Sequence, residues 1–136
     1  MIVKKQKKQR PKNLDLFTIR LPVNAVVSIL HRASGVVLFL IQPLLLWALY
    51  LSLSSAQGYA SVAAQCQQWP VKLLITVLAG AFFHHFYAGI RHLAMDVHWM
   101  TTLQKARFSS RVVLWLVAVT MVSVIWAIWV KGEYVV

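Results

Sequence analysis

The chain has 136 residues, of which 60% are hydrophobic and only 12% are charged. Soluble domains carry about twice that share of charged residues, so the composition excludes an ordinary soluble domain and indicates an integral membrane protein. The formal charge of +11 comes from 14 basic and 3 acidic side chains. The basic residues occupy alternate polar segments, which favours a topology signal over nucleic-acid binding.

Residues 1–23 form the first element that we expect, a basic arm in front of the first apolar run. Half of the basic side chains lie here: Lys4, Lys5, Lys7, Lys8, Arg10, Lys12 and Arg20. Because Lys and Arg are enriched in the cytoplasmic segments of membrane proteins, we expect the arm to lie in the cytoplasm. The basic part and the apolar run that follows it are both too long for a typical secretory signal peptide.

The first predicted transmembrane helix covers about residues 24–53. Its most apolar part runs from Ala33 to Leu53, close to the roughly 20 residues that cross the hydrocarbon layer of a bilayer. Pro43 lies inside this run and has no backbone N–H to donate to the preceding turn. We therefore expect a kink in the first helix.

The second and third predicted helices cover about residues 68–95 and 107–131. Their apolar runs are Val71–Ile90 and the uncharged Val112–Val130. The segment 54–70 contains no Lys or Arg, whereas three basic residues precede the third run: Lys105, Arg107 and Arg111. The segment 54–70 and the carboxyl terminus should therefore lie outside the cytoplasm. We expect a single all-α membrane domain with three transmembrane helices over all 136 residues.

Polar residues mark one face of each of the first two helices. In the first helix they have the spacing i, i+3, i+4 and i+7: Ser28, His31, Arg32 and Gly35. In the second helix the spacing is i, i+4, i+7 and i+11: His85, Gly89, His92 and Asp96. Such residues share a helix face. The predicted topology brings both faces to the cytoplasmic side of the membrane, so we expect them to meet at one depth.

Ionisable residues inside a membrane are costly and usually mark a functional site. A neutral imidazole is a common axial ligand of haem iron, and the two haem propionates would supply anions for Arg32, His31 and His92. Gly89 lies one turn from His85 and would let a flat macrocycle approach the helix. Since no other histidine lies deep in the remaining spans, a second axial ligand would come from another chain.

Other interpretations of the same residues stay open. His84 and His85 differ by about 100° in helical phase, and either imidazole could instead form a hydrogen bond to a neighbouring helix. His31 and Arg32 could extend to lipid phosphates. Gly89 could serve close helix packing without any cofactor. Helical phase groups His85, but not His84, with Gly89 and His92, which favours His85 as the ligand.

Three motifs carry a resemblance to a known family. They are RP-x-NLDL and S-x-x-HR-x-SG, within Gln9 to Gly35, and H-x-x-x-GIRH-x-x-x-D, from His85 to Asp96. Together they resemble the cytochrome b subunit of bacterial succinate dehydrogenase, the larger membrane anchor of complex II. The likeness extends over most of the chain from Gln9 to the third helix. Pro43 and His84 lie at positions where the family is not expected to impose a requirement.

The resemblance implies roles for individual residues. His85 would be one axial ligand of a haem b, and the smaller anchor subunit would provide the other. Ser28 and Arg32 match quinone-site positions, where a hydroxyl and a guanidinium polarise quinone carbonyls. Cofactor contacts would come from the following set: His31, Arg32, Gly35, Gly89 and His92. Asp96 would help to organise the cytoplasmic mouth of the quinone site or its proton supply.

The resemblance also implies a complex in the bacterial inner membrane. A flavoprotein with FAD and an iron–sulfur subunit would oxidise succinate in the tricarboxylic acid cycle and pass electrons to ubiquinone. The heterotetramer would form trimers in some cases. Two rivals remain at this point, a quinol:fumarate reductase anchor that runs the reverse reaction and a membrane scaffold without a cofactor. A small transporter is less favoured, because the polar residues gather at one side of the membrane.

Overall fold

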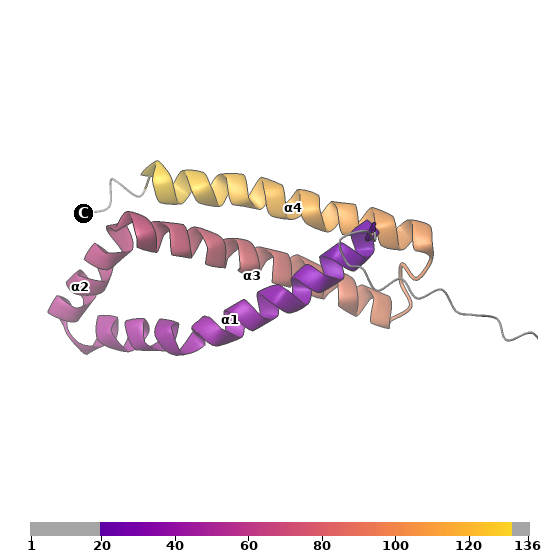
Figure 1. The fold of residues 1–136 in the computed structure, drawn as a ribbon. Helices are drawn as coiled ribbons and strands as arrows, with labels where there is room; N and C mark the ends of the chain where they lie inside the picture. Colours follow the sequence, from indigo (N-terminus) through magenta and orange to yellow (C-terminus); the bar gives the residue numbers. More distant parts are fainter. Residues whose placement is uncertain (1–19, 132–136) are drawn as a thin grey trace, which may run out of the picture.

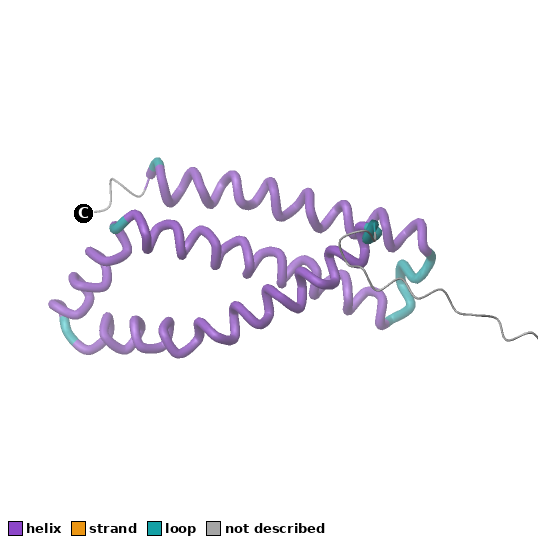
Figure 2. Tube along the Cα trace, viewed as in Figure 1, coloured by secondary structure: helices purple, strands orange, loops and turns teal. Residues whose placement is uncertain are grey.

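Four α-helices account for almost all of residues 20–131, the part of the chain that the computed structural model describes. They are α1 (Val23–Ser54), α2 (Ala56–Gln67), α3 (Trp69–Asp96) and α4 (Leu103–Trp129). No strand occurs within those residues, and Figure 2 shows short loops between the helices. Most of the predicted basic arm and the whole RP-x-NLDL motif lie outside the described residues.

Three of the helices, α1, α3 and α4, are long and apolar enough to cross a membrane. The prediction of an all-α membrane protein with three spanning helices is therefore confirmed. In Figure 1, α3 lies between α1 and α4, and α4 runs back along α3 while α1 crosses α3 obliquely. The start of α1, the end of α3 and the start of α4 share one end of the bundle.

The segment between the first two spanning helices is itself helical. Within the segment 54–70, α2 forms 12 residues of helix that join the far ends of α1 and α3. Ser55 begins this helix by accepting a hydrogen bond from the Gly58 N–H at 3.0 Å, which satisfies one donor of the first turn. The polar composition of the segment, without a clear apolar stripe, did not predict this helix.

The path of α1 follows from its proline. The helix continues through Pro43 without a break, and Figure 1 shows that it changes direction near its middle. Proline removes one backbone hydrogen bond and crowds the preceding turn, which bends a helix. The expected kink is present, and it separates the end of α1 from α3 on the side that α2 bridges.

The interior of the bundle is more polar than its surface. Among the described residues, three buried side chains are apolar, and these are Val27, Ala88 and Val113. Six others are polar or charged: Ser34, Lys72, His84, Arg91, Ser109 and Ser110. Most large apolar side chains instead point outward. This distribution suits a bilayer, where lipid solvates apolar groups while small and polar residues pack between helices.

Side-chain hydrogen bonds join α3 to α4 along most of their length. Near the α2 end, the Trp129 indole N–H donates to Thr76 Oγ1 at 3.2 Å. In the middle, the Tyr87 hydroxyl and Thr120 Oγ1 lie 3.0 Å apart. A further contact at the opposite end involves Arg91 and is described below. These bonds hold α3 in a defined rotation, and that rotation decides which of its histidines faces α1.

Candidate functional site

The histidines predicted to share one depth meet where α1 crosses α3. The His31 ring from α1 stacks on the His85 ring from α3, with centroids 4.2 Å apart and planes 10° from parallel. The His92 ring also lies close to the His31 ring, with centroids 4.9 Å apart and a 45° tilt. The two polar faces therefore form one cluster of three imidazoles, which we call the histidine cluster.

The His85 imidazole is held on one side by α1. Its Nδ1 lies 3.0 Å from the His31 carbonyl oxygen and 3.3 Å from Ser34 Oγ. Because a carbonyl can only accept, Nδ1 must carry the proton when this hydrogen bond forms. The other ring nitrogen, Nε2, then has its lone pair available for a metal. Nε2 makes no hydrogen bond to another described residue.

Two glycines lie against these imidazoles. A Cβ built on Gly35 would lie 2.9 Å from His85 Cε1 and 3.3 Å from Nδ1, so the imidazole occupies the space of the missing side chain. A Cβ on Gly89 would lie 3.5 Å from His31 Nε2. Gly35 thus receives an imidazole from the facing helix, whereas the contact at Gly89 is an ordinary van der Waals distance. His31 lies beside Gly89, where the sequence had suggested a flat macrocycle.

Ser28, Arg32 and Asp96 lie toward the predicted cytoplasmic end. Ser28 is half-buried in the second turn of α1, and Arg32 lies one turn later with an exposed guanidinium. Asp96 is the last residue of α3 and is also exposed. None of these three side chains forms a hydrogen bond to another described residue.

His84 lies on a different face of α3 from His85. It is 8% exposed, and neither ring nitrogen has a hydrogen-bond partner among the described residues. The buried Ala88 lies one turn further along this face. The structure therefore separates the adjacent histidines, with His85 against α1 and His84 enclosed in the bundle.

No sequence pattern indicated a role for Arg91 or Ser34, and both are buried. Arg91 is 6% exposed, and its Nε donates to Ser109 Oγ at 3.0 Å while its Nη2 donates to the Ala106 carbonyl at 3.4 Å. It thereby joins the end of α3 to the start of α4. Arg91 follows His84 by seven residues, so its position on the buried face could have been read from helical phase.

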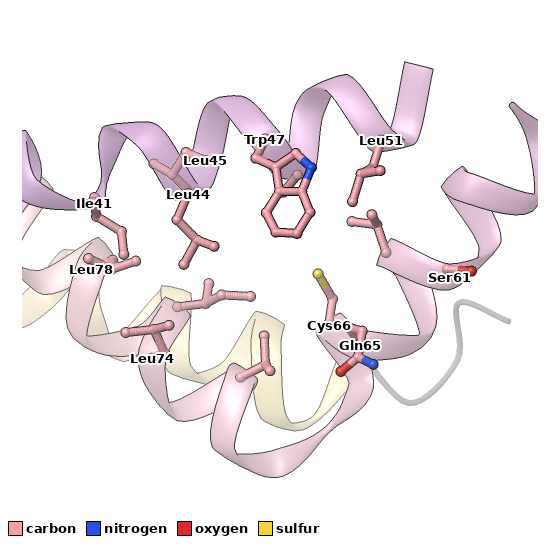
Figure 3. A pocket seen from close by; sticks show the side chains of 14 residues that line it. Ile41, Leu44, Leu45, Trp47, Leu51, Ser61, Gln65, Cys66, Leu74 and Leu78 are labelled. Atoms are coloured by element: carbon pink, nitrogen blue, oxygen red, sulfur yellow. The ribbon is translucent and has the colours of Figure 1, made fainter. Parts of the chain in front are cut away.

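A cavity of about 380 Å³ lies at the other end of the bundle, between α1, α2 and α3. Figure 3 shows Trp47 and Cys66 pointing into it among leucine side chains. Its polar lining residues are uncharged, namely Ser61 and Gln65 beside the Cys66 thiol. It contains no imidazole or guanidinium, so the chemistry-bearing residues of the chain lie at the histidine cluster and not in this cavity.

With this geometry established, comparison with known families identifies the chain. The family described as succinate dehydrogenase/fumarate reductase transmembrane subunit matches residues 6–124. The chain belongs to that family. As a succinate dehydrogenase/fumarate reductase transmembrane subunit, it is a membrane protein and part of an oxidoreductase complex.

Individual relatives agree with this assignment. Over 125 residues the chain is 34% identical to the succinate dehydrogenase cytochrome b556 subunit of Coxiella burnetii, which covers 90% of this chain and 97% of that protein. The subunit of the same name from Rickettsia felis is 30% identical, covering 90% and 92% of the two chains. That of Paracoccus denitrificans is 29% identical, covering 77% and 81%. The resemblance that the motifs indicated is confirmed.

One imidazole of this transmembrane subunit has the chemistry of a haem-iron ligand. Among the described residues, no group of three or more His, Cys, Asp or Glu side chains is arranged to hold a metal ion. A haem does not require such a group, because its macrocycle supplies four nitrogens and the protein supplies axial ligands. His85 offers one imidazole with a protonated Nδ1 and a free Nε2, which is the donor that a haem iron uses.

Proposed function

We propose that this chain is the cytochrome b anchor of a succinate dehydrogenase, holding one side of a haem b and forming one wall of a quinone-reduction site. The observation that carries the proposal is the His85 imidazole, whose Nδ1 meets the His31 carbonyl at 3.0 Å and whose Nε2 remains available. His85 also occupies the histidine position of the H-x-x-x-GIRH motif. When bound, the haem supplies a one-electron redox centre.

A second iron ligand would come from the smaller anchor subunit. His31 is the nearest imidazole to His85, but the two rings stack face to face at 4.2 Å. A ring stacked in this way cannot direct a nitrogen lone pair toward a metal held by His85 Nε2 without leaving the stack. His31, His92 and Arg32 provide hydrogen-bond donors for the haem propionates. Gly35 allows the close helix approach that gathers these residues, and Gly89 lies beside His31.

Ser28 and Arg32 form the quinone wall of the site. They are spaced i and i+4 on α1, so both side chains project from one helix face toward the predicted cytoplasmic side. A hydroxyl and a guanidinium can donate hydrogen bonds to quinone carbonyl oxygens, and a positive charge stabilises negative charge that develops there on reduction. Asp96, exposed at the end of α3, contributes to proton supply from the cytoplasm.

The complex has four kinds of subunit in the bacterial inner membrane, and its heterotetramers assemble into trimers. A flavoprotein with FAD and an iron–sulfur subunit dock on the cytoplasmic side, where the amino terminus lies, and the carboxyl terminus faces the periplasm. Support for this orientation comes from the basic residues of the arm and of the segment between α3 and α4, which the positive-inside rule assigns to the cytoplasm. The electron acceptor is ubiquinone.

The ligand assignment is tested in the intact complex with two neighbouring substitutions. We expect His85→Ala to abolish or alter the low-spin b-type signal in low-temperature reduced-minus-oxidised spectra, because the iron loses a ligand. His84→Ala is the matched control and should retain the signal, since His84 lies on another face of α3. Loss of the signal in His84→Ala alone would refute the assignment. A wild-type complex without b-type bands would instead support a scaffold without cofactor.

The quinone wall is tested by separating two activities of the same complex. Ser28→Ala and Arg32→Ala should lower succinate-driven quinone reduction roughly 10- to 100-fold, which corresponds to one hydrogen bond to a charged group. Succinate oxidation by an artificial acceptor should change less than twofold. Arg111→Ala, which removes an exposed arginine from α4, is the control. Equal losses in both assays would indicate defective assembly and contradict the quinone role.

The direction of the reaction is tested on the wild-type complex. We expect succinate-driven quinone reduction to exceed quinol-driven fumarate reduction when both are measured on one preparation. Predominance of fumarate reduction would favour the quinol:fumarate reductase alternative, which belongs to the same family.

A further inference from the structure

Ser34 is a buried polar residue whose side chain lies against the proposed haem ligand. It is 7% exposed, and its Oγ lies 3.3 Å from His85 Nδ1 and 2.9 Å from the His31 carbonyl oxygen. His85 Nδ1 in turn lies 3.0 Å from that same carbonyl. Three polar groups from two helices thus form a closed triangle on the side of the imidazole that faces away from Nε2.

The directions of these hydrogen bonds follow from the chemistry of the groups. The His31 carbonyl accepts from both neighbours, so the Ser34 O–H points to it and the His85 Nδ1–H points to it as well. With its hydrogen committed to the carbonyl, Ser34 Oγ presents lone pairs toward Nδ1–H. His85 Nδ1–H therefore has two acceptors, one at 3.0 Å and one at 3.3 Å.

The ring is also restrained against rotation. The Gly35 backbone lies against one edge of the imidazole, where a Cβ would be 2.9 Å from Cε1. The His31 ring covers one of its faces. Rotation about the Cβ–Cγ bond of His85 would therefore break both hydrogen bonds and collide with α1. These contacts are compatible with only one tautomer and one ring orientation of His85.

We propose that Ser34, together with the His31 carbonyl, is a positioning residue for His85 that sets the basicity of Nε2 and hence the redox potential of the haem. The inference rests on the proposed function, since it requires His85 to be the iron ligand. Hydrogen bonding to the distal N–H of a ligating histidine fixes its tautomer and makes the ligand a stronger donor. A stronger donor favours ferric iron and lowers the midpoint potential.

A purely structural role for Ser34 makes a different prediction. Serine hydroxyls within helices often bond a carbonyl one turn earlier without any further function. Ser52, in the same helix, makes such a bond to the Leu49 carbonyl at 2.8 Å and lies near the opposite end of α1 from the histidine cluster. Ser52→Ala therefore removes an equivalent hydrogen bond from a serine hydroxyl to a backbone carbonyl, at a position that does not contact His85.

The experiment compares Ser34→Ala, Ser34→Thr and Ser52→Ala in the purified intact complex. Haem content is measured first, then the midpoint potential by redox titration and the low-spin g values by electron paramagnetic resonance. We expect Ser34→Ala to retain haem, shift the potential upward and change the g values. Ser34→Thr keeps a hydroxyl and should shift the potential less, and Ser52→Ala should match the wild type.

The outcomes separate this inference from the proposed function. An unchanged or lowered potential in Ser34→Ala would overturn the role of Ser34, as would an equal shift in Ser52→Ala or in Ser34→Thr. Those results would leave His85 as a ligand, provided that His85→Ala still abolishes the low-spin signal. Retention of the low-spin signal in His85→Ala would overturn both the ligand assignment and the role of Ser34.

Discussion

At position 35, the lack of a side chain decides how closely α1 and α3 approach. The His85 imidazole occupies the space of the missing Cβ and reaches the α1 backbone there. Gly80 on α3 has a different environment, because its Cβ would lie 3.8 Å from the side chain of Met121. The first contact is too short for an alanine, whereas the second is an ordinary van der Waals distance.

We therefore expect Gly35→Ala to displace His85 and to break its hydrogen bond to the His31 carbonyl. Overpacking of this kind costs about 1–3 kcal/mol, and the low-spin haem signal should weaken together with the stability of the complex. Gly80→Ala is the control and should leave both unchanged. Spectra and thermal unfolding of the two complexes provide the measurement. A normal haem signal in Gly35→Ala would show that His85 does not depend on this close approach.

The burial of His84 costs free energy, because its ring nitrogens lack hydrogen-bond partners among the described residues. Both ring nitrogens are buried without a partner among the described residues, and an unsatisfied buried polar group costs about 1–3 kcal/mol. An apolar side chain of similar size would avoid that cost. The same rotation of α3 that directs His85 toward α1 encloses His84, so the two neighbours cannot exchange roles without turning the helix by about 100°.

At the scale of the element, two separate faces of α3 contact two different helices. One face carries His85, Gly89 and His92 toward α1. The other carries Tyr87 and Arg91 toward α4, where both form hydrogen bonds. Since the helix is rigid, bonds on the α4 side fix the rotation of the side that faces α1. The position of the proposed iron ligand therefore depends on residues that never touch it.

Arg91 provides the test of this dependence. Hydrogen bonds to a charged group contribute about 1.5–3 kcal/mol, so Arg91→Leu should lower the free energy of unfolding by about 2 kcal/mol and should broaden the haem signal as α3 gains freedom. Arg111→Leu removes an exposed arginine from α4 and should change stability by less than about 0.5 kcal/mol. Unfolding of the purified complex in mixed micelles measures both. Equal effects of the two substitutions would argue against the α3–α4 bond.

At the scale of the whole molecule, the surface and the interior are reversed relative to a soluble bundle. Large apolar side chains cover the outside of α1, α3 and α4, and the buried residues are mainly polar. Lipid and partner subunits would cover the apolar surface in the complex. The polar groups of the histidine cluster and the basic residues at the start of α4 lie toward the same end of the bundle. The two ends of the molecule therefore differ in polarity and charge.

Orientation is tested by cysteine labelling in a Cys66→Ala background, because Cys66 is the sole native cysteine. Gln57→Cys in α2 should react with a membrane-impermeant maleimide in intact cells, since α2 is expected on the periplasmic side. Gln104→Cys at the start of α4 should react only after lysis. Both side chains are exposed in the structure, so differences in reactivity report the side of the membrane. The reverse pattern would invert the topology.

By itself, the sequence determined the three spanning helices and the kink of the first one at Pro43. It also grouped His85 with Gly89 and His92. Hydrophobic length and helical period are local properties, so a sequence pattern can show them. It did not reveal α2, which has little apolar periodicity, or the roles of Ser34 and Arg91. Tertiary structure alone decided that His85 rests in the space beside Gly35 while His84 is enclosed. The physical reason is that the rotation of α3 is set by contacts with residues more than ten positions away, in α1 and α4, which no local pattern encodes.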